Sequence, residues 1–416
     1  MKWRNQLLAL FCLLVFFAFG VFYFQYWVVQ KPFGIILFVA EGLDAQTLAA
    51  ARSHADSADR ALALDSFPYT AFLMNDSADS AVPDPAAAAT ALATGTKTRN
   101  GSVALDADGE TLVALLRRAR ETGRMTGLIT DGNLTGPTAA SFYGHAERSD
   151  GWEEFARQLI ETSEIDVVLG GGSADFLPEA HGGRRTDGKD LLSAAREAGY
   201  SLVQSLAELE EVPRWRRAKL LGLFDDKEHA TKEATTTPAE QPTLSDLVRR
   251  GIELLQFHRG GYLIVVDAAA LRKAGGESRE RQTAAVELDR AIAVASEYTG
   301  EKSAIFVCGD VADDVNDADR DMSLPPATEP DLFFWGSLPK VWNADDSKVV
   351  LWDWNFEREI ATTSALSLSR DQRSLTKSGQ TRRAADVPAF GMGLGADALH
   401  GTLDNTAIFA IISDNL

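Results

Sequence analysis

Cysteine and histidine are both scarce in this chain of 416 residues. The two cysteines, Cys12 and Cys308, exclude a disulfide framework and a thiolate metal cluster. Six histidines leave a zinc site built on imidazole ligands with few donors. Basic residues are also outnumbered, because 41 Lys and Arg face 60 Asp and Glu, giving a net charge of −19. A protein this acidic does not hold nucleic acid through its overall field, so we expect no nucleic-acid partner.

One uncharged apolar stretch, Leu7–Val29, is long enough to cross a membrane. It has 23 positions and one polar side chain, Gln25. As a helix rising 1.5 Å per residue it would be about 34 Å long, against a hydrocarbon core of about 30 Å. Signal-peptide cores are shorter and end in small residues, whereas Tyr26 and Trp27 stand near the end of this stretch. We therefore expect an uncleaved anchor rather than a cleaved signal peptide.

The residues that flank this stretch predict its orientation. Lys2 and Arg4 precede it and aromatic residues gather at its far end, a pattern that places the N-terminus in the cytoplasm. Residues 1–30 are thus predicted to be a cytoplasmic start and a transmembrane anchor, and residues 31–416 a domain outside the cytoplasm. Anchors of this kind suit a bacterial inner membrane, crossed once, with the main domain periplasmic or extracellular.

From Phe33 onward, short apolar runs alternate with amphipathic stretches. Strands buried on both faces are predicted at 34–39, 126–130, 165–169, 262–266 and 304–307. Helices are predicted at 111–121, 152–160, 191–198, 244–257 and 280–298. This alternation predicts an α/β fold with a mainly parallel central sheet and helices on both faces. Residues 225–242 are predicted to be an exposed loop, and residues 313–380 an irregular insertion that contains Trp335, Trp342, Trp352 and Trp354.

Polar residues follow several of the predicted strands. Glu41 follows the first strand, and Asp267 and Asp310 follow two later ones. Residues 82–101 have the pattern of a loop, a helix and a glycine stop, and residues 135–140 follow another strand. In a sheet of this kind, ligands bind at the carboxyl ends of the strands. We therefore expect the functional residues at these ends.

The helical segment Ala88–Gly101 resembles the nucleophile helix of the alkaline phosphatases. Further matches to that family, in chain order, are Gly170–Gly172 with Phe176–Pro178, Lys219–Phe224, Asp386–Pro388 and Asp404–Thr406. The resemblance implies the three-layer sandwich of that family. It also implies phosphomonoester hydrolysis by a serine nucleophile with two zinc ions and one magnesium ion, and a possible homodimer.

The family's nucleophile motif, Asp-Ser-Ala, is replaced here by Asp84-Pro85-Ala86. Proline has no hydroxyl group, and residues 86–89 are all alanine, so no adjacent serine can take over. Asp84 suits a helix N-cap, and Pro85 suits the first helical position, where a missing N–H costs nothing. The resemblance therefore implies a helix start that is kept and a nucleophile that is lost.

Most zinc ligands implied by the resemblance are replaced as well. At the zinc site nearer the leaving group, the family's positions hold Arg272, Gly276 and Arg382. At the second zinc site, they hold Glu41, Asp310, Val311 and Pro85. Two carboxylates without imidazole make a poor zinc site, so we expect no zinc.

The family's magnesium positions keep their oxygen donors. They correspond to Glu41, Thr138 and Asp267, and Asp310 could add a fourth donor. Water could complete the shell of a single Mg²⁺ or Ca²⁺. Alternatively, the carboxylates pair with the arginines that replace zinc ligands, since a guanidinium carries a fixed positive charge. We favour arginine pairing over a bound metal.

Three arginines are candidates for binding phosphate or another anion, namely Arg148, Arg272 and Arg382. Arg148 lies in a stretch that resembles the one carrying the family's phosphate-binding arginine. His145, in the same stretch, is expected to be structural.

Two functions remain open, the first of them with or without binding of phosphate by the three arginines. The first is a membrane-anchored homologue outside the cytoplasm that has lost phosphomonoester hydrolysis and serves a binding or scaffolding role. The alternative is a hydrolase of phosphoric or sulfuric monoesters whose remodelled site uses one hard cation and arginines. We favour the first, because losing the nucleophile and the leaving-group zinc ligands each typically costs orders of magnitude in rate.

Overall fold

The computed structural model describes residues 2–23, 31–54, 61–215, 219–224, 241–273, 279–300, 302–311, 341–345, 348–353, 358–364 and 386–416. The chain forms two compact units, residues 1–323 with 384–416, and residues 324–383. Helix α1 (Lys2–Tyr23) is long and apolar enough to cross a membrane. The far end of the predicted anchor, residues 24–29, lies outside the described residues.

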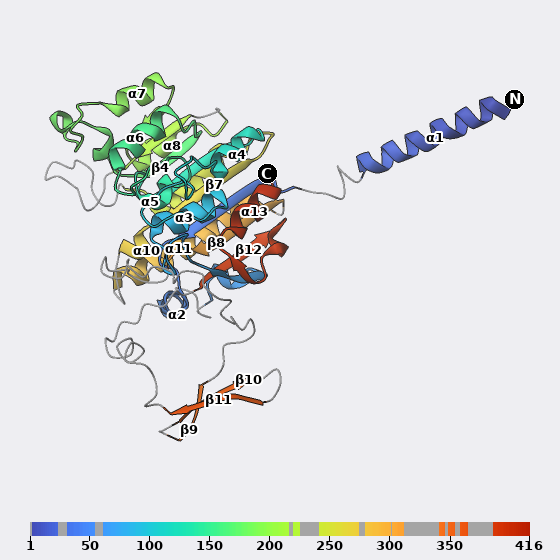
Figure 1. Cartoon of the computed structure of the whole chain (residues 1–416). Coiled ribbons are helices and arrows are strands. Elements are labelled where there is room, and N and C mark those ends of the chain that lie inside the picture. The colour runs from blue at the N-terminus through green and yellow to red at the C-terminus, as the bar shows by residue number, and fades with distance from the viewer. Residues whose placement is uncertain are drawn as a thin grey trace. The chain divides into compact units, whose positions relative to one another are not determined.

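The larger unit is built on a ten-stranded sheet (Figure 1). Its strands lie in the order β13 (Gly401–Asp404), β2 (Tyr69–Met74), β12 (Val387–Gly393), β8 (Ser303–Gly309), β1 (Gly34–Ala40), β7 (Tyr262–Ala268), β3 (Met125–Asn133), β4 (Val167–Gly171), β6 (Leu220–Leu223) and β5 (Ser201–Val203). Strand β12 runs antiparallel to both of its neighbours, and the other neighbouring pairs in this sheet are parallel. The mainly parallel sheet predicted from the sequence is confirmed.

Helices cover both faces of the sheet. One apolar cluster joins Leu37 to residues of α3 (Pro85–Thr94), α4 (Leu115–Glu121), α5 (Pro137–Ala140), α6 (Trp152–Glu161), α7 (Leu191–Glu197) and α13 (Ala407–Asp414). The other joins Phe38 to residues of α2 (Ala45–His54), α8 (Leu206–Glu211), α9 (Leu244–Leu255), α10 (Ala270–Lys273) and α11 (Arg279–Thr299). Successive side chains of β1 enter the two clusters in turn, as expected for a strand covered on both faces. Short 3₁₀ turns lie at η2 (Ala63–Ser66), η3 (Ser173–Phe176), η4 (Glu179–His181) and η8 (Ala396–Ala398).

The predicted elements agree with the structure apart from shifted ends. The clearest shift is in α4, which begins at Leu115, because Thr111 instead forms an isolated bridge with Leu105. Of the predicted loop 225–242, residues 225–240 lie outside the described residues. Most of the predicted insertion does too, and its described parts are the antiparallel strands β9 (Val341–Asp345), β10 (Lys348–Asp353) and β11 (Arg358–Ser364).

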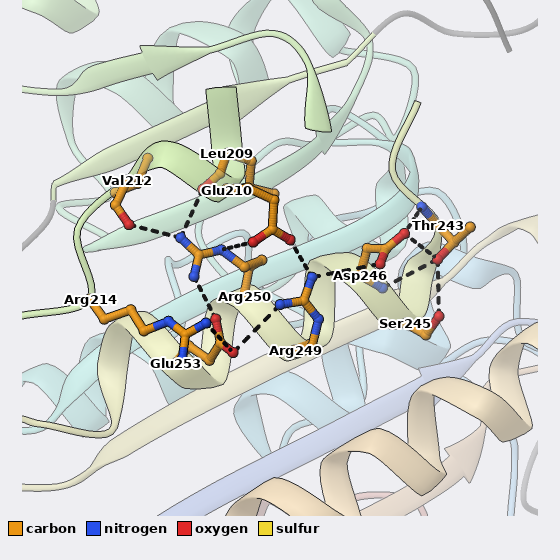
Figure 2. Close-up of polar contacts among 10 residues, drawn as sticks. All are labelled: Leu209, Glu210, Val212, Arg214, Thr243, Ser245, Asp246, Arg249, Arg250 and Glu253. Atoms are coloured by element: carbon orange, nitrogen blue, oxygen red, sulfur yellow. Dashed lines mark hydrogen bonds and ion pairs between the residues drawn. The ribbon is translucent and has the colours of Figure 1, made fainter. Parts of the chain in front are cut away.

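A buried ion pair within α9 is hydrogen-bonded to α8 and to the chain that follows it (Figure 2). Arg250 is fully buried, and its Nη1 lies 2.5 Å from Oε2 of Glu253, one turn along the helix. Nη2 of Arg250 donates to the carbonyl oxygens of Leu209 and Val212, each at 2.8 Å. Glu253 also faces Arg214 across 3.2 Å. Because a buried charge is tolerated only when paired and hydrogen-bonded, this network fixes the position of the chain after α8 against α9.

Candidate functional site

Three carboxylates gather where the central parallel strands end. Ala40 of β1 is paired with Ala268 of β7 and Gly309 of β8. Glu41 and Asp310 follow Ala40 and Gly309, so they lie side by side where β1 and β8 end. Asp267 lies on the neighbouring strand β7, paired with Val39. Each of the three residues is at most 2% exposed. The topology thus concentrates negative charge in a buried position at the carboxyl edge, where ligands of such sheets bind.

Arg272 supplies a positive charge to this carboxylate cluster, Glu41, Asp267 and Asp310. It stands on the short helix α10, directly after β7, and its Nη2 lies 2.5 Å from Oε2 of Glu41. The Arg272 side chain is 27% exposed, whereas that of Glu41 is only 3% exposed. Arg272, the more exposed partner, therefore neutralises the buried carboxylate of Glu41.

Backbone and hydroxyl donors hold the other two carboxylates. Oδ1 of Asp310 accepts hydrogen bonds from the amide N–H of Gly42 at 2.9 Å and of Val311 at 2.5 Å. Oδ2 of Asp267 accepts from the hydroxyl of Thr130 at 3.0 Å. Each carboxylate thus has one oxygen that is fixed by the protein.

Burial and mutual repulsion raise the pKa of both aspartates. Desolvation is the largest cause for Asp310, followed by the charge of Glu41, and together they raise its pKa to about 7 even though Arg272 opposes the shift. Desolvation, then the charge of Glu41, also raises the pKa of Asp267 well above its ordinary value. Burial alone would lower the pKa of Arg272, but the surrounding carboxylates outweigh it and raise that pKa. The negative charge of the three carboxylates is therefore not fully balanced by Arg272.

Several buried oxygens near these strand ends have no hydrogen-bond partner within the described part of the chain. They are Oδ1 of Asp267, Oδ2 of Asp310 and the hydroxyl of Thr138, at the first turn of α5. Oxygens of this kind are ligands that Mg²⁺ or Ca²⁺ accepts. However, Glu41 is engaged by Arg272, and no group of three or more His, Cys, Asp or Glu side chains among the described residues is arranged to hold a metal. The donor set does not fit zinc, and it falls short of a complete hard-cation site.

The start of helix α3 has the geometry expected from Asp84 and Pro85. Asp84 is the N-cap, and its Oδ1 accepts from the amide of Ala87 at 2.8 Å while Oδ2 accepts from the amide of Gly101 at 2.7 Å. Pro85 takes the first helical position. The alanines that follow it are buried. The helix start is thus complete without any hydroxyl group at position 85.

The remaining sequence candidates lie apart from this cluster or outside the described residues. Arg148 is 79% exposed and forms an ion pair with Asp150 at 2.5 Å. Nε2 of His145 lies 2.8 Å from the carbonyl oxygen of Leu112, a contact within the fold. Gly276 and Arg382 fall outside the described residues. Of the two candidate anion-binding arginines among the described residues, Arg148 and Arg272, only Arg272 contacts the carboxylate cluster.

Sequence reasoning missed two residues that support the site. Asp131 accepts a hydrogen bond from the amide of Ala270 at 3.0 Å and so fixes the start of α10. Asn75 donates to the carbonyl oxygen of Asp310 and accepts from Asn405 at 3.0 Å. Asn405 lies in a matched motif and Asp131 follows a predicted strand, so both could have been identified, whereas nothing in the local sequence distinguished Asn75.

Comparisons with known proteins agree on one family. A family model for alkaline phosphatase matches residues 34–416. The tissue-nonspecific alkaline phosphatase of Gallus gallus is 29% identical over 322 residues, which make up 66% of this chain and 62% of that protein. Alkaline phosphatase 3 of Bacillus subtilis (strain 168) is 30% identical over 208 residues, 49% of this chain and 42% of its own length. The chain thus spans less than two thirds of the length of these relatives.

Solved structures give the same fold. The alkaline phosphatase from the Antarctic bacterium TAB5 has a TM-score of 0.65 at 18% identity, covering 93% of this chain and 98% of that chain. The Thermus thermophilus alkaline phosphatase has a TM-score of 0.65 at 21% identity, covering 93% and 92%. At these identities the likeness shows the fold alone.

Proposed function

This chain belongs to the alkaline phosphatase family, and from that premise we propose that it is a membrane-anchored member without phosphomonoester hydrolysis. Its domain outside the cytoplasm then serves a binding or scaffolding role. The single observation that supports this proposal is the start of α3, where Pro85 takes the first helical position. By the resemblance to the family's nucleophile motif, this is the position of the serine. Proline has no oxygen with which to attack phosphorus, so no covalent phosphoryl intermediate can form at this residue.

The carboxylate cluster adds to this proposal. The leaving-group oxygen of a phosphate ester needs a positive charge to stabilise it, which a zinc ion supplies in this family. By the resemblance, Arg272 stands at one of the ligand positions of that ion, and its charge is already engaged by Glu41. Removing either nucleophilic attack or leaving-group stabilisation typically lowers a rate by orders of magnitude.

One observation favours the alternative function, a hydrolase of phosphoric or sulfuric monoesters with a remodelled site. The unpartnered oxygens of Thr138, Asp267 and Asp310 could accept a single Mg²⁺ or Ca²⁺. Such an ion would lower the pKa of a bound water and let it replace the serine. The Glu41–Arg272 ion pair weighs against this arrangement, because it occupies the carboxylate that such an ion would share.

A hydrolysis assay separates the two functions. The full-length protein in detergent is given p-nitrophenyl phosphate or p-nitrophenyl sulfate with Zn²⁺, Mg²⁺ or Ca²⁺ in turn. We expect no turnover above the buffer rate with either ester. Metal-dependent turnover that disappears in D267N and D310N would overturn the proposal and support the remodelled hydrolase. E121Q, which alters the exposed ion pair of Glu121 with Arg117, is the matched control.

The location of the protein is part of the same proposal. We infer that α1 spans a bacterial inner membrane once, with the N-terminus in the cytoplasm and the domain that begins near residue 31 in the periplasm. The apolar length of α1 and the charges of Lys2 and Arg4 before it support this orientation. Protease added to spheroplasts should digest the domain, and protection of the domain would reverse the orientation.

Gel filtration in detergent tests for the homodimer that the family resemblance implies.

A further inference from the structure

The turn that follows β1, Glu41–Gly42, is held from several sides by charged groups. The Glu41 carboxylate pairs with Arg272, and the amide of Gly42 donates to Asp310. The carbonyl oxygen of Gly42 accepts from Nη2 of Arg281 at 2.7 Å. Two guanidinium groups therefore reach a turn that begins with a buried carboxylate. In a family built on divalent cations, this position is where a metal charge would be expected.

The attachment of Arg272 suits a fixed internal charge. Asp131 fixes the first residue of α10 through the Ala270 amide, and α10 places Arg272 two residues later. Gly42 has a φ of +80°, and a Cβ there would lie 3.7 Å from Cβ of Arg272, so the arginine stem packs close to the turn. A guanidinium stays protonated at any pH at which the protein folds. Its charge, unlike that of a bound ion, cannot dissociate.

We propose that Arg272 is a built-in cation that takes over the charge-balancing role of a resident metal, so that the carboxylate cluster is stable without any divalent ion. The donor set agrees with this assignment, since it does not fit zinc and its first carboxylate is engaged by Arg272. Removal of Arg272 would leave Glu41 buried, at 3% side-chain exposure, beside two further carboxylates. The vacated position would then favour an added cation.

Thermal unfolding of the full-length protein in detergent tests the proposal, with and without EDTA and with millimolar Mg²⁺ or Ca²⁺. We expect the wild-type Tm to be the same in all these conditions, and elemental analysis to find no stoichiometric metal. R272A should lower the Tm by about 4 °C, the lower end of what is expected when one partner of a buried pair is removed from a domain of this size, because the Arg272 side chain is 27% exposed. Mg²⁺ or Ca²⁺ should restore part of that loss. R148A should match the wild type, because its ion pair is exposed.

Two further variants keep the test decisive if R272A does not fold. R272K preserves the charge, so its Tm should remain insensitive to EDTA. E41Q/R272A removes both charges and should have a higher Tm than R272A, in which Glu41 has lost its partner. A wild-type Tm that falls in EDTA and recovers with Mg²⁺ would overturn the proposal. So would an R272A Tm equal to that of R148A.

This inference and the proposed function fail separately. The inference rests on the Arg272–Glu41 pair, and the proposed function rests on Pro85. A protein that hydrolyses esters but is insensitive to EDTA in unfolding would refute only the proposed function. An inactive protein that loses stability in EDTA would refute only the role of Arg272.

Discussion

Replacing Glu253 by alanine should be among the most destabilising single changes in the core. Arg250 is fully buried and Glu253 is 1% exposed, so the substitution leaves a guanidinium without its counter-ion in the apolar cluster of α9 (Figure 2). Breaking a buried ion pair in this way costs about 3–5 kcal/mol. The carboxylate of Glu210, 3.7 Å from Nε of Arg250, remains and still partly balances the charge of the guanidinium. We therefore expect a loss of stability at the lower end of this range, about 3 kcal/mol.

Thermal unfolding followed by circular dichroism measures this loss in the full-length protein. Because the unfolding entropy is about 2 cal/mol/K per residue, 3 kcal/mol corresponds to a fall in Tm of about 4 °C in a domain of this length. E154A is the matched control, since it breaks a pair with Arg157 on the exposed face of α6. Its expected cost is below about 1 kcal/mol. An E253A protein as stable as E154A would refute the reasoning that this buried charge needs its partner.

Other changes test the site and the sheet. D84A removes a cap that accepts two backbone hydrogen bonds and should cost about 1–2 kcal/mol by denaturant unfolding, whereas D84N should cost less. G393A should abolish soluble expression or strongly lower the Tm, because φ is +93° and a Cβ would lie 1.9 Å from the carbonyl oxygen of Ser303. Stability should fall as pH rises from about 4 to about 7 and then level off, because the folded state keeps on Asp310 a proton that the unfolded chain releases near pH 4. In D310N, the free energy of unfolding should depend less on pH over this range. An unchanged pH dependence would mean that another group causes it.

Much of the sheet could be predicted because its central strands are apolar on both faces. The run Ile35–Val39 has no polar residue, and a segment of that kind has few alternatives to a strand covered on both sides. Helix ends depend on contacts that the apolar pattern does not show. Leu112 and Val113 continue the helical pattern before α4, but backbone pairing of Thr111 with Leu105 removes that stretch from the helix.

The candidate site was predictable in its strand ends but not in its pairings. Spacing placed Glu41, Asp267 and Asp310 at one edge, because parallel strands of known direction end together. The sequence also predicts that arginines neutralise them. It could not say that Arg272 pairs with Glu41, since a long side chain reaches any of the three carboxylates. Asp131 directly follows the strand predicted at 126–130, so the same strand-end criterion could have identified it, although the strand itself continues to Asn133.

The antiparallel pairing of β8 with β12 has a consequence for how this protein can diverge. Cys308 is paired with Ala389, so the chain leaves the sheet after Gly309 and re-enters it at Val387 on the adjacent strand. A short turn would suffice to join these two points, and the entropy of closing a longer connection grows only with the logarithm of its length. The register of β8 against β12 therefore sets no fixed length for the chain that joins them. This junction is a natural point for transplanting foreign sequence.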